Sequence, residues 1–315
     1  MEKPHECRSP EGVRGVSGRI GKEKEKRTLN LKSLKDDLQT IQQIGSLTRT
    51  VHLTSASKYQ REQRRKENFE LYAKELEGVF SIALHRAAAD FLEEHPRLQP
   101  RIPFKRSWLI VLGADRGLCG AYNNNLFSYL EKYEFTPAPE KVVLFGTKAV
   151  FWGRKHFSQR QERPQFLQHI DFNHLWLEAE SLARAYAKAE YDVVWLAYQR
   201  MRSPTLFEPV VEQFLPLSRP VSEPATEQVH QMELVVEPDF QQLLEFILPQ
   251  YITALLFRAV LELLVGNEAS RMIAMQKASE NAENEYMKKK RQYQHARQTK
   301  ITNEVLEITS GRRTM

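Results

Sequence analysis

Two long stretches of the chain, one near each end, contain no proline. Residues 28–95 and residues 251–315 each hold no proline and only two glycines. Most of the fifteen prolines of the 315-residue chain lie between these stretches. Because proline and glycine are the residues that interrupt helices, long helices are predicted at both ends. This distribution does not fit two ordinary globular domains in tandem, which the length alone would suggest.

Apolar residues in the N-terminal stretch have the spacing of a coiled coil. Leu31, Leu34, Leu38 and Ile41 follow one another at intervals of three or four residues, as successive a and d positions do. The pattern stops at residues 60–68, which contain no apolar side chain, and then resumes. This polar segment is predicted to be either a solvated helix surface or a contact surface on an exposed rod. Its basic residues are Arg61, Arg64, Arg65 and Lys66.

The C-terminal stretch can form a helix of about 60 residues, which would be about 90 Å long. A domain of this size contains no straight element of that length, and a single projecting helix is marginally stable in water. The N-terminal helix is the obvious partner. We therefore expect residues 29–95 and 239–315 to form an antiparallel coiled coil, with residues 104–237 inserted between them.

The central part of the chain has the pattern of an α/β domain. Apolar runs at residues 108–112, 141–145 and 191–198 are typical of strands that are buried on both faces, and helical segments separate them. This order predicts a small, mostly parallel sheet with helices packed on it. Further strands are predicted at residues 206–217 and 232–236.

A glycine-rich loop, residues 113–120, follows the first predicted strand and precedes a helix. Phosphate-binding loops of α/β proteins occupy this place. The loop matches neither G-x-G-x-x-G nor a P-loop that ends in G-K-[ST]. We interpret it as a tight turn, with the ligand site of a nucleotide-dependent enzyme as the alternative. Since no motif of a catalytic centre and no metal-ligand spacing is found, we expect no catalytic residue, cofactor or metal.

Charge and cysteine content are typical of a soluble chain in a reducing compartment. The formal net charge is +6, and half of this excess belongs to residues 1–28, which hold eight basic and five acidic side chains. We interpret residues 1–28 as a disordered basic extension. The two cysteines, Cys7 and Cys119, are too few for a disulfide framework. No uncharged apolar run approaches the length that a membrane-spanning helix needs.

Three separate parts of the chain resemble the gamma subunit of F-type ATP synthases. Residues 53–59, LTSASKY, resemble the family's M-V-A-A-S-K-M. Residues 115–120, DRGLCG, followed by NNNL at 123–126, are similar to its D-R-G-L-C-G-x-x-N-x-N. Residues 268–275, EASRMIAM, and residues 296–308, ARQTKITNEVLEI, resemble its E-x-x-A-R-M-x-A-M and A-R-Q-x-x-I-T-x-E-L-x-E-I.

The likeness spans roughly residues 29–311 and implies both an architecture and a function. The terminal helices would form a rotor shaft with a Rossmann-like domain at its base. The shaft would turn inside a ring of three alpha and three beta subunits, which hold the catalytic nucleotides. Its foot would contact an epsilon subunit and the membrane ring of c subunits, through which ion flow drives rotation. The chain would then be a non-catalytic subunit on the cytoplasmic face of a bacterial inner membrane, with no membrane span of its own.

Matched positions also imply roles for individual residues. Rotor–stator contacts with the alpha and beta ring would be made by Lys58, Arg271, Arg297, Gln298, Thr302 and Glu304. The last four of these would lie near the shaft tip. The motif loop of the family corresponds to Asp115, Arg116, Gly117, Leu118, Cys119 and Gly120.

A different interpretation of the same features is a basic coiled-coil hairpin that binds nucleic acid. It would use Arg61, Arg64 and Arg65 together with the basic run at residues 288–291. Isolation with ATP synthase subunits, or only with RNA or DNA, separates the two interpretations.

Overall fold

Two long helices occur in the computed structural model, which describes residues 14–87, 89–95, 97–217 and 239–311. They are α1 (Arg14–Arg86) and α7 (Phe240–Gly311). α1 begins inside the segment that the sequence predicts to be disordered, whose residues 1–13 lie outside the described part. The predicted N-terminal helix also ends early, at Arg86, and a short helix α2 (Ala89–Glu94) follows it.

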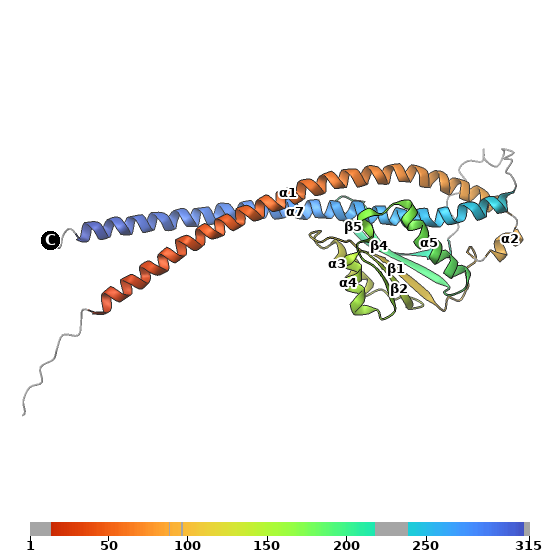
Figure 1. Ribbon diagram of the computed structural model, residues 1–315, viewed down its shortest axis with the longest axis horizontal. Coiled ribbons are helices and arrows are strands. Elements are labelled where there is room, and N and C mark those ends of the chain that lie inside the picture. Colours follow the sequence, from red (N-terminus) through yellow and green to blue (C-terminus); the bar gives the residue numbers. More distant parts are fainter. Residues whose placement is uncertain (1–13, 88, 96, 218–238, 312–315) are drawn as a thin grey trace, which may run out of the picture. The chain divides into compact units, whose positions relative to one another are not determined.

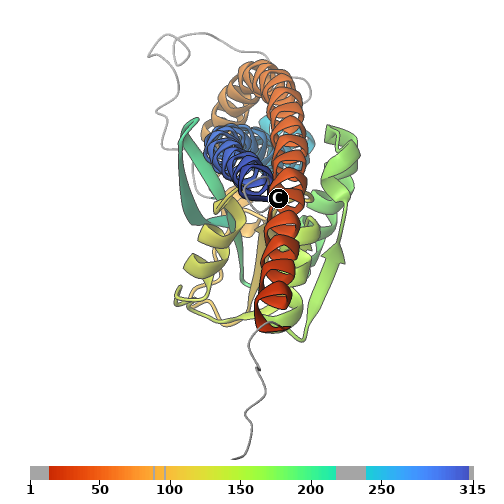
Figure 2. The same cartoon turned by 90° about the vertical axis from the view of Figure 1, so that its left-hand side faces the viewer.

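The chain separates into two units, residues 51–275 and residues 1–50 with 276–315, and each is described by itself. In the first unit α1 and α7 lie side by side, whereas in the second unit they separate toward the start of α1 and the end of α7 (Figures 1 and 2). Lys289 of α7 pairs with Asp37 of α1 at 2.8 Å in the second unit. In the first unit Glu70 pairs with Arg258 at 3.3 Å, and Phe80 stacks on Tyr251 with ring centroids 4.2 Å apart. Because the partner number falls along α7 as the residue number rises along α1, the helices are antiparallel, as predicted.

The central sheet has five strands in the order β3-β2-β1-β4-β5. Its first four strands pair in parallel, and β5 joins β4 antiparallel at the edge. The mostly parallel sheet confirms the prediction, whereas the short β3 is not predicted, because its sequence RQER is polar. The predicted strand at residues 232–236 lies outside the described residues. The strands are β1 (Ser107–Leu112), β2 (Pro139–Phe145), β3 (Arg160–Arg163), β4 (Val193–Ser203) and β5 (Leu206–Leu215).

Helices cover both faces of the sheet, which explains the continuous apolar runs. Leu109 and Val111 of β1 pack with α3 and α4, and Ile110 and Leu112 pack with α5 and α7. The part of α1 in this unit packs on α7 through Phe80 and its neighbours. The remaining helices are α3 (Tyr122–Leu130), α4 (Thr147–His156), the 3-10 turn η1 (Phe166–His169) and α5 (Phe172–Ala187).

The polar segment at residues 60–68 is partly buried inside the protein. Neither of the two predictions for this segment includes such burial. Glu62 is 7% exposed, and Arg65 donates to the carbonyl oxygen of Ile170 at 2.7 Å. Lys66 pairs with Glu262 of α7 at 3.5 Å. Charged side chains can lie at a helix–helix contact when their groups are paired, so a missing apolar seam did not mean an exposed surface.

α7 is the one described helix that is long and apolar enough to cross a membrane by length and composition. However, 67% of its most apolar window is buried inside the protein, as in the core helix of a soluble domain. The helix also continues through Pro249. Leu248 and Ile252 on either side are fully buried, and their packing offsets the one hydrogen bond that proline removes.

Candidate functional site

The glycine-rich loop packs against the start of α4 at the carboxyl end of β1. Gly146 has a φ of +88°, and a Cβ atom there would lie 1.8 Å from the carbonyl oxygen of Gly113. A Cβ atom on Gly113 would in turn lie 2.8 Å from Ala149. Gly120, which ends the loop, also has a positive φ of 56°. The glycines therefore serve turns and close backbone approach, in keeping with the tight-turn interpretation.

The Asp115 carboxylate holds three segments together. Its Oδ1 atom accepts hydrogen bonds from the backbone N–H of Thr147 at 2.9 Å and of Gln165 at 3.0 Å. Its Oδ2 atom accepts from the N–H of Leu167 at 3.1 Å. Thr147 is the first residue of α4. A side-chain carboxylate therefore occupies the helix N-terminus at which α/β proteins commonly bind a phosphate.

Two side chains of α7 tie the same loop to the long helix. Arg271 donates through Nε to the carbonyl oxygen of Gly117 at 3.0 Å. Ser270 donates through its hydroxyl to the carbonyl oxygen of Cys119 at 2.7 Å. The Arg271 guanidinium also pairs with Glu268 at 2.6 Å. The loop thus joins the sheet, α4 and α7.

Arg271 does not have the surroundings that the resemblance implies. It lies on the shaft helix as expected, but it is only 5% exposed, and its second terminal nitrogen donates to Asn267 at 3.3 Å. Arg271 and Ser270 thus bind the loop to α7, and we call these contacts the clasp. The expected rotor–stator contact of Arg271 stays a prediction.

The loop tip exposes one apolar side chain and buries a thiol. Leu118 has a φ of +64° and is 65% exposed. Cys119 is 3% exposed and accepts a hydrogen bond from the Asn123 amide at 3.1 Å. Burial raises the pKa of the Cys119 thiol, and the nearby Arg271 lowers it by a smaller amount. A buried thiol with a raised pKa is a packing residue and not a reactive nucleophile.

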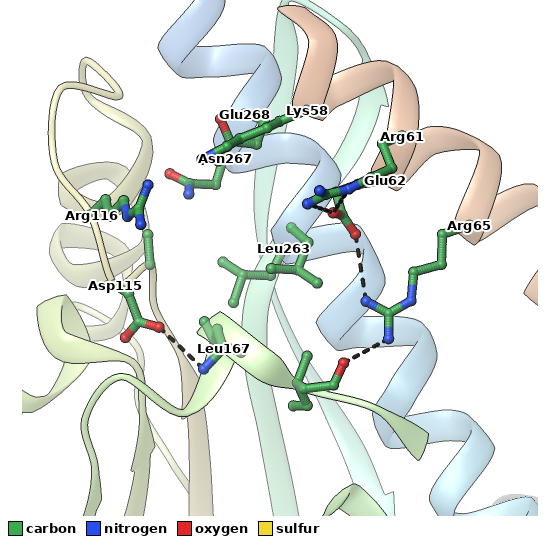
Figure 3. A pocket seen from close by; sticks show the side chains of 13 residues that line it. Lys58, Arg61, Glu62, Arg65, Asp115, Arg116, Leu167, Leu263, Asn267 and Glu268 are labelled. Atoms are coloured by element: carbon green, nitrogen blue, oxygen red, sulfur yellow. Dashed lines mark hydrogen bonds and ion pairs between the residues drawn. The ribbon is translucent and has the colours of Figure 1, made fainter. Parts of the chain in front are cut away.

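A cavity of about 390 Å³ lies beside the loop, bounded by α1, η1 and α7 (Figure 3). Lys58 of α1 is half-buried at this cavity, and Arg116 of the loop is exposed at its edge. Neither side chain makes a hydrogen bond or ion pair with the described residues. The charged residues around the cavity are Lys58, Arg61, Glu62, Arg65, Asp115, Arg116 and Glu268.

The other four expected contact residues are exposed on α7, in the second unit. Thr302 donates to the carbonyl oxygen of Gln298 at 3.0 Å, and Glu304 lies 3.7 Å from Lys300. Arg297 and Gln298 are exposed as well. All these contacts lie within one helix, so the side chains remain accessible. The apolar neighbours that are about half exposed or more are Ile301, Val305, Leu306 and Ile308.

Comparison with known proteins decides the family. A family model described as ATP synthase matches residues 30–315. The ATP synthase gamma chain of Cupriavidus metallidurans is 32% identical over 293 residues, which cover 89% of this chain and 97% of the relative. The chain belongs to the ATP synthase gamma chain family. Another gamma chain, from Acidithiobacillus ferrooxidans, is 29% identical over 289 residues, covering 90% of this chain and 98% of the relative.

Solved ATP synthases contain chains with the same fold. One is in the OSCP/F1/c-ring of the Euglena gracilis mitochondrial ATP synthase, with a TM-score of 0.62 and 15% identity, covering 91% of this chain and 94% of that one. Another is in the central stalk/c-ring of the Tetrahymena thermophila enzyme, with a TM-score of 0.55 and 18% identity, covering 74% and 99%. The long terminal helices and the α/β domain are therefore the architecture of an ATP synthase central stalk.

As a member of this family, the gamma chain is a non-catalytic stalk subunit of ATP synthase. The described residues include no group of three His, Cys, Asp or Glu side chains that could hold a metal ion. The nucleic-acid interpretation has no support. Two of its basic groups are used internally, because Arg65 binds Ile170 and Lys289 pairs with Asp37 at 2.8 Å.

Sequence reasoning missed the partners that complete the clasp. Asn123, Asn267 and Ser270 lie inside or next to the matched motifs, but they received no role. Nothing in their spacing indicates that segments about 150 residues apart meet. The available signal was that two motifs of one family, at residues 115–126 and 268–275, both contain charged residues and lie in or next to amide residues.

Proposed function

We propose that this gamma chain is the rotating shaft that couples ion flow through a membrane ring of c subunits to ATP synthesis or hydrolysis in a ring of alpha and beta subunits. The coupling would be mechanical, since the shaft is a non-catalytic subunit. An epsilon subunit would bind with the c ring at the foot of the shaft. The chain would act at the cytoplasmic face of a bacterial inner membrane. Its family membership is the observation that carries this proposal.

The exposed tip motif supports a contact with the alpha and beta subunits. Arg297, Gln298, Thr302 and Glu304 are accessible, and they lie among partly exposed apolar side chains. Hydrogen bonds that involve a charged group contribute about 1.5–3 kcal/mol each. Contacts of that strength can hold a shaft at a defined angle and still break at each step. We assign the rotor–stator contacts to these four residues.

The clasp around the glycine-rich loop supports torque transmission within the unit that contains it. A shaft helix must not slip on the domain through which it is turned. Arg271 and Ser270 bind backbone carbonyl groups of the loop, and Asp115 binds the backbone of α4 and η1. On the other shaft helix, Arg65 binds the carbonyl oxygen of Ile170. Both helices thus contact the α/β domain through partly buried polar groups as well as through apolar packing.

The double variant Arg297→Ala with Gln298→Ala tests the tip contact in the assembled complex. We expect ATP hydrolysis and ATP-driven ion pumping to fall by about tenfold, because a charge-assisted contact with the stator is lost. The isolated variant chain should keep its helix content, since both residues are exposed.

The adjacent pair Arg291-Gln292 provides a matched control. It has the same composition, lies on the same helix and is exposed. We expect Arg291→Ala with Gln292→Ala to leave turnover within about twofold of the unmodified complex. Equal losses in the two double variants, or no loss in either, would contradict a specific contact at the tip motif.

A further inference from the structure

The cavity beside the glycine-rich loop lies where α/β sheets bind ligands. In the strand order β3-β2-β1-β4-β5, the chain moves outward from β1 in one direction and then returns to add β4 on its other side. Ligands of open parallel sheets bind outside the carboxyl ends of the strands at this switch point. Ala114, Asp115 and Arg116, which follow β1 directly, form one wall of the cavity.

Apolar side chains from two elements form a second part of the wall. Leu167 and Ile170 contribute from η1 and its end, and Leu263 and Leu264 contribute from α7 (Figure 3). Figure 3 shows the charged side chains around this apolar surface. A volume of about 390 Å³ is within the range of pockets that bind small molecules. Eight of the thirteen lining residues are charged or polar, so the cavity suits a charged ligand with a small apolar part better than an apolar ligand.

Two cations on different walls of the cavity lack an acceptor among the described residues. Lys58 comes from α1 and Arg116 from the loop after β1. Lys58 is half-buried, and its ammonium group has no carboxylate partner among the described residues. Arg61, at the same cavity, is bound to Glu62 at 2.7 Å. The unpaired positive charge of the cavity thus comes from Lys58 and Arg116.

Two carboxylates at the same cavity each have an oxygen without a donor among the described residues. Glu62 uses Oε1 for Arg61, and its buried Oε2 lies 3.6 Å from Arg65, which is beyond hydrogen-bond distance. Glu268 uses Oε1 for Arg271, and its Oε2 is buried without a hydrogen bond. A buried oxygen without a donor is unfavourable. Both oxygens are covered by protein atoms, so a ligand that brings hydroxyl or amino donors would bind them after the two side chains turn toward the cavity.

We propose that this cavity binds a small phosphate ester that carries hydroxyl or amino donors, the chemical class to which nucleotides belong. The phosphate would accept from the Lys58 ammonium and the Arg116 guanidinium. The donors would bind Glu62 and Glu268, and the apolar surface of η1 and α7 would cover the less polar part of the ligand. The ligand would bridge α1 and the α/β domain, and it would stiffen this part of the shaft without undergoing a reaction. This proposal does not depend on the proposed rotary function.

An acidic protein segment would also be attracted by Lys58 and Arg116, but the cavity favours the smaller ligand. A carboxylate-rich segment of several residues is too large for a cavity of about 390 Å³. A phosphate ester satisfies both the cations and the carboxylates. The two ligands therefore make opposite predictions in a binding experiment.

Calorimetric titration of the isolated full chain with ATP, ADP, AMP and tripolyphosphate tests the site, at physiological ionic strength. We expect one saturable site for the nucleotides and at least tenfold weaker binding of tripolyphosphate, which has no donors for the carboxylates. Lys58→Gln and Arg116→Gln should each weaken nucleotide binding by about tenfold, the effect of losing one charge-assisted hydrogen bond. Neither variant should lose helix content, because neither side chain is bound inside the described structure.

Lys132→Gln is the matched control, because Lys132 is exposed at the end of α3 and away from the cavity. It should leave the affinity within about twofold. Absence of saturable nucleotide binding would overturn the proposal, as would equal losses in Lys132→Gln and in the two cavity variants. Binding of a glutamate-rich peptide as tight as that of ATP, weakened by the same two substitutions, would overturn it in favour of an acidic protein partner.

Discussion

At the residue scale, charged residues of the matched motifs hold separate segments of the chain together by hydrogen bonds to the backbone. Asp115 accepts backbone hydrogen bonds from two segments that follow it in the chain, and Arg271 binds the backbone of the loop that contains Asp115. Each replaces solvent contacts of a charged group with several short contacts inside the chain. Such groups stabilise a fold only while all their partners are present.

Replacement of Arg271 by alanine should strongly destabilise the chain. The change leaves the Glu268 carboxylate and the Gly117 carbonyl oxygen without their donor in a buried place. We expect the free energy of unfolding to fall by about 3–5 kcal/mol, as when one partner of a buried pair is removed. Denaturant unfolding of the isolated chain measures this fall in the free energy of unfolding. Arg184, whose pair with Glu180 is on the surface, is the control, and Arg184→Ala should cost less than about 1 kcal/mol.

Asp115→Asn should also destabilise the chain, but less. The amide keeps one oxygen for Thr147, and its NH₂ group then faces the N–H of Leu167, with which it cannot hydrogen-bond. We expect a loss of about 1–3 kcal/mol in the free energy of unfolding. Asp36→Asn, at an exposed position of α1, should change it by less than about 0.5 kcal/mol. A loss in Asp36→Asn as large as that in Asp115→Asn would contradict the assigned role of Asp115.

At this scale the sequence predicted positions better than roles. The family resemblance singled out Asp115, Arg271 and Arg297 in advance. It could not predict that Arg271 turns inward, because burial of a helix face depends on which loop packs there. Lys58 was likewise expected at a stator contact, and its half-buried place beside a cavity follows from the fold of residues 113–120 onto α7.

At the scale of elements, helix breakers and apolar periodicity predicted most of the architecture. The two long helices follow from the lack of helix breakers and from the helical spacing of apolar residues, and the parallel strands β1, β2 and β4 follow from continuous apolar runs. β3 carries only polar residues, and its pairing with β2 gives it a strand conformation. The polar segment at residues 60–68 was misread, because charged side chains that pair across helices leave no apolar period.

The junction between α2 and α7 should respond to pH. His95 is 5% exposed, its Nε2 atom lies 3.1 Å from Glu245, and its Nδ1 atom accepts from the N–H of Arg97 at 3.3 Å. Burial lowers the pKa of His95 despite the opposing effect of Glu245. The folded chain therefore disfavours the imidazolium form more than the unfolded chain does.

The sign of the pH effect follows from this lowered pKa. Above about pH 6.5, His95 is neutral in both states and the contribution to stability is complete. As the pH falls below about 6.5, the unfolded chain takes up a proton first and the free energy of unfolding decreases. We expect His95→Gln to show a smaller loss between pH 7 and pH 5.5 than the unmodified chain in denaturant unfolding. His174→Gln, at an exposed position, is the control. If His95→Gln leaves the pH dependence of the free energy of unfolding unchanged, the role assigned to His95 is contradicted.

At the scale of the whole molecule, the proposed function is that this gamma chain turns as a shaft within ATP synthase. Its family and its fold are those of a central stalk. Rotation itself is a property of the assembled complex, and sequence patterns within one chain can predict only the stiff helices that it needs. Partners and direction of turning depend on surfaces of other subunits.

Observation of a probe on single assembled complexes tests this claim most directly. A label can be placed by Lys132→Cys at the exposed end of α3, with Cys7 replaced by serine, because the remaining Cys119 is buried. With the alpha and beta ring held on a surface and ATP supplied, we expect stepwise rotation in one direction that stops when ATP is removed. A label that stays fixed or moves randomly, in complexes that hydrolyse ATP at the full rate, would contradict it.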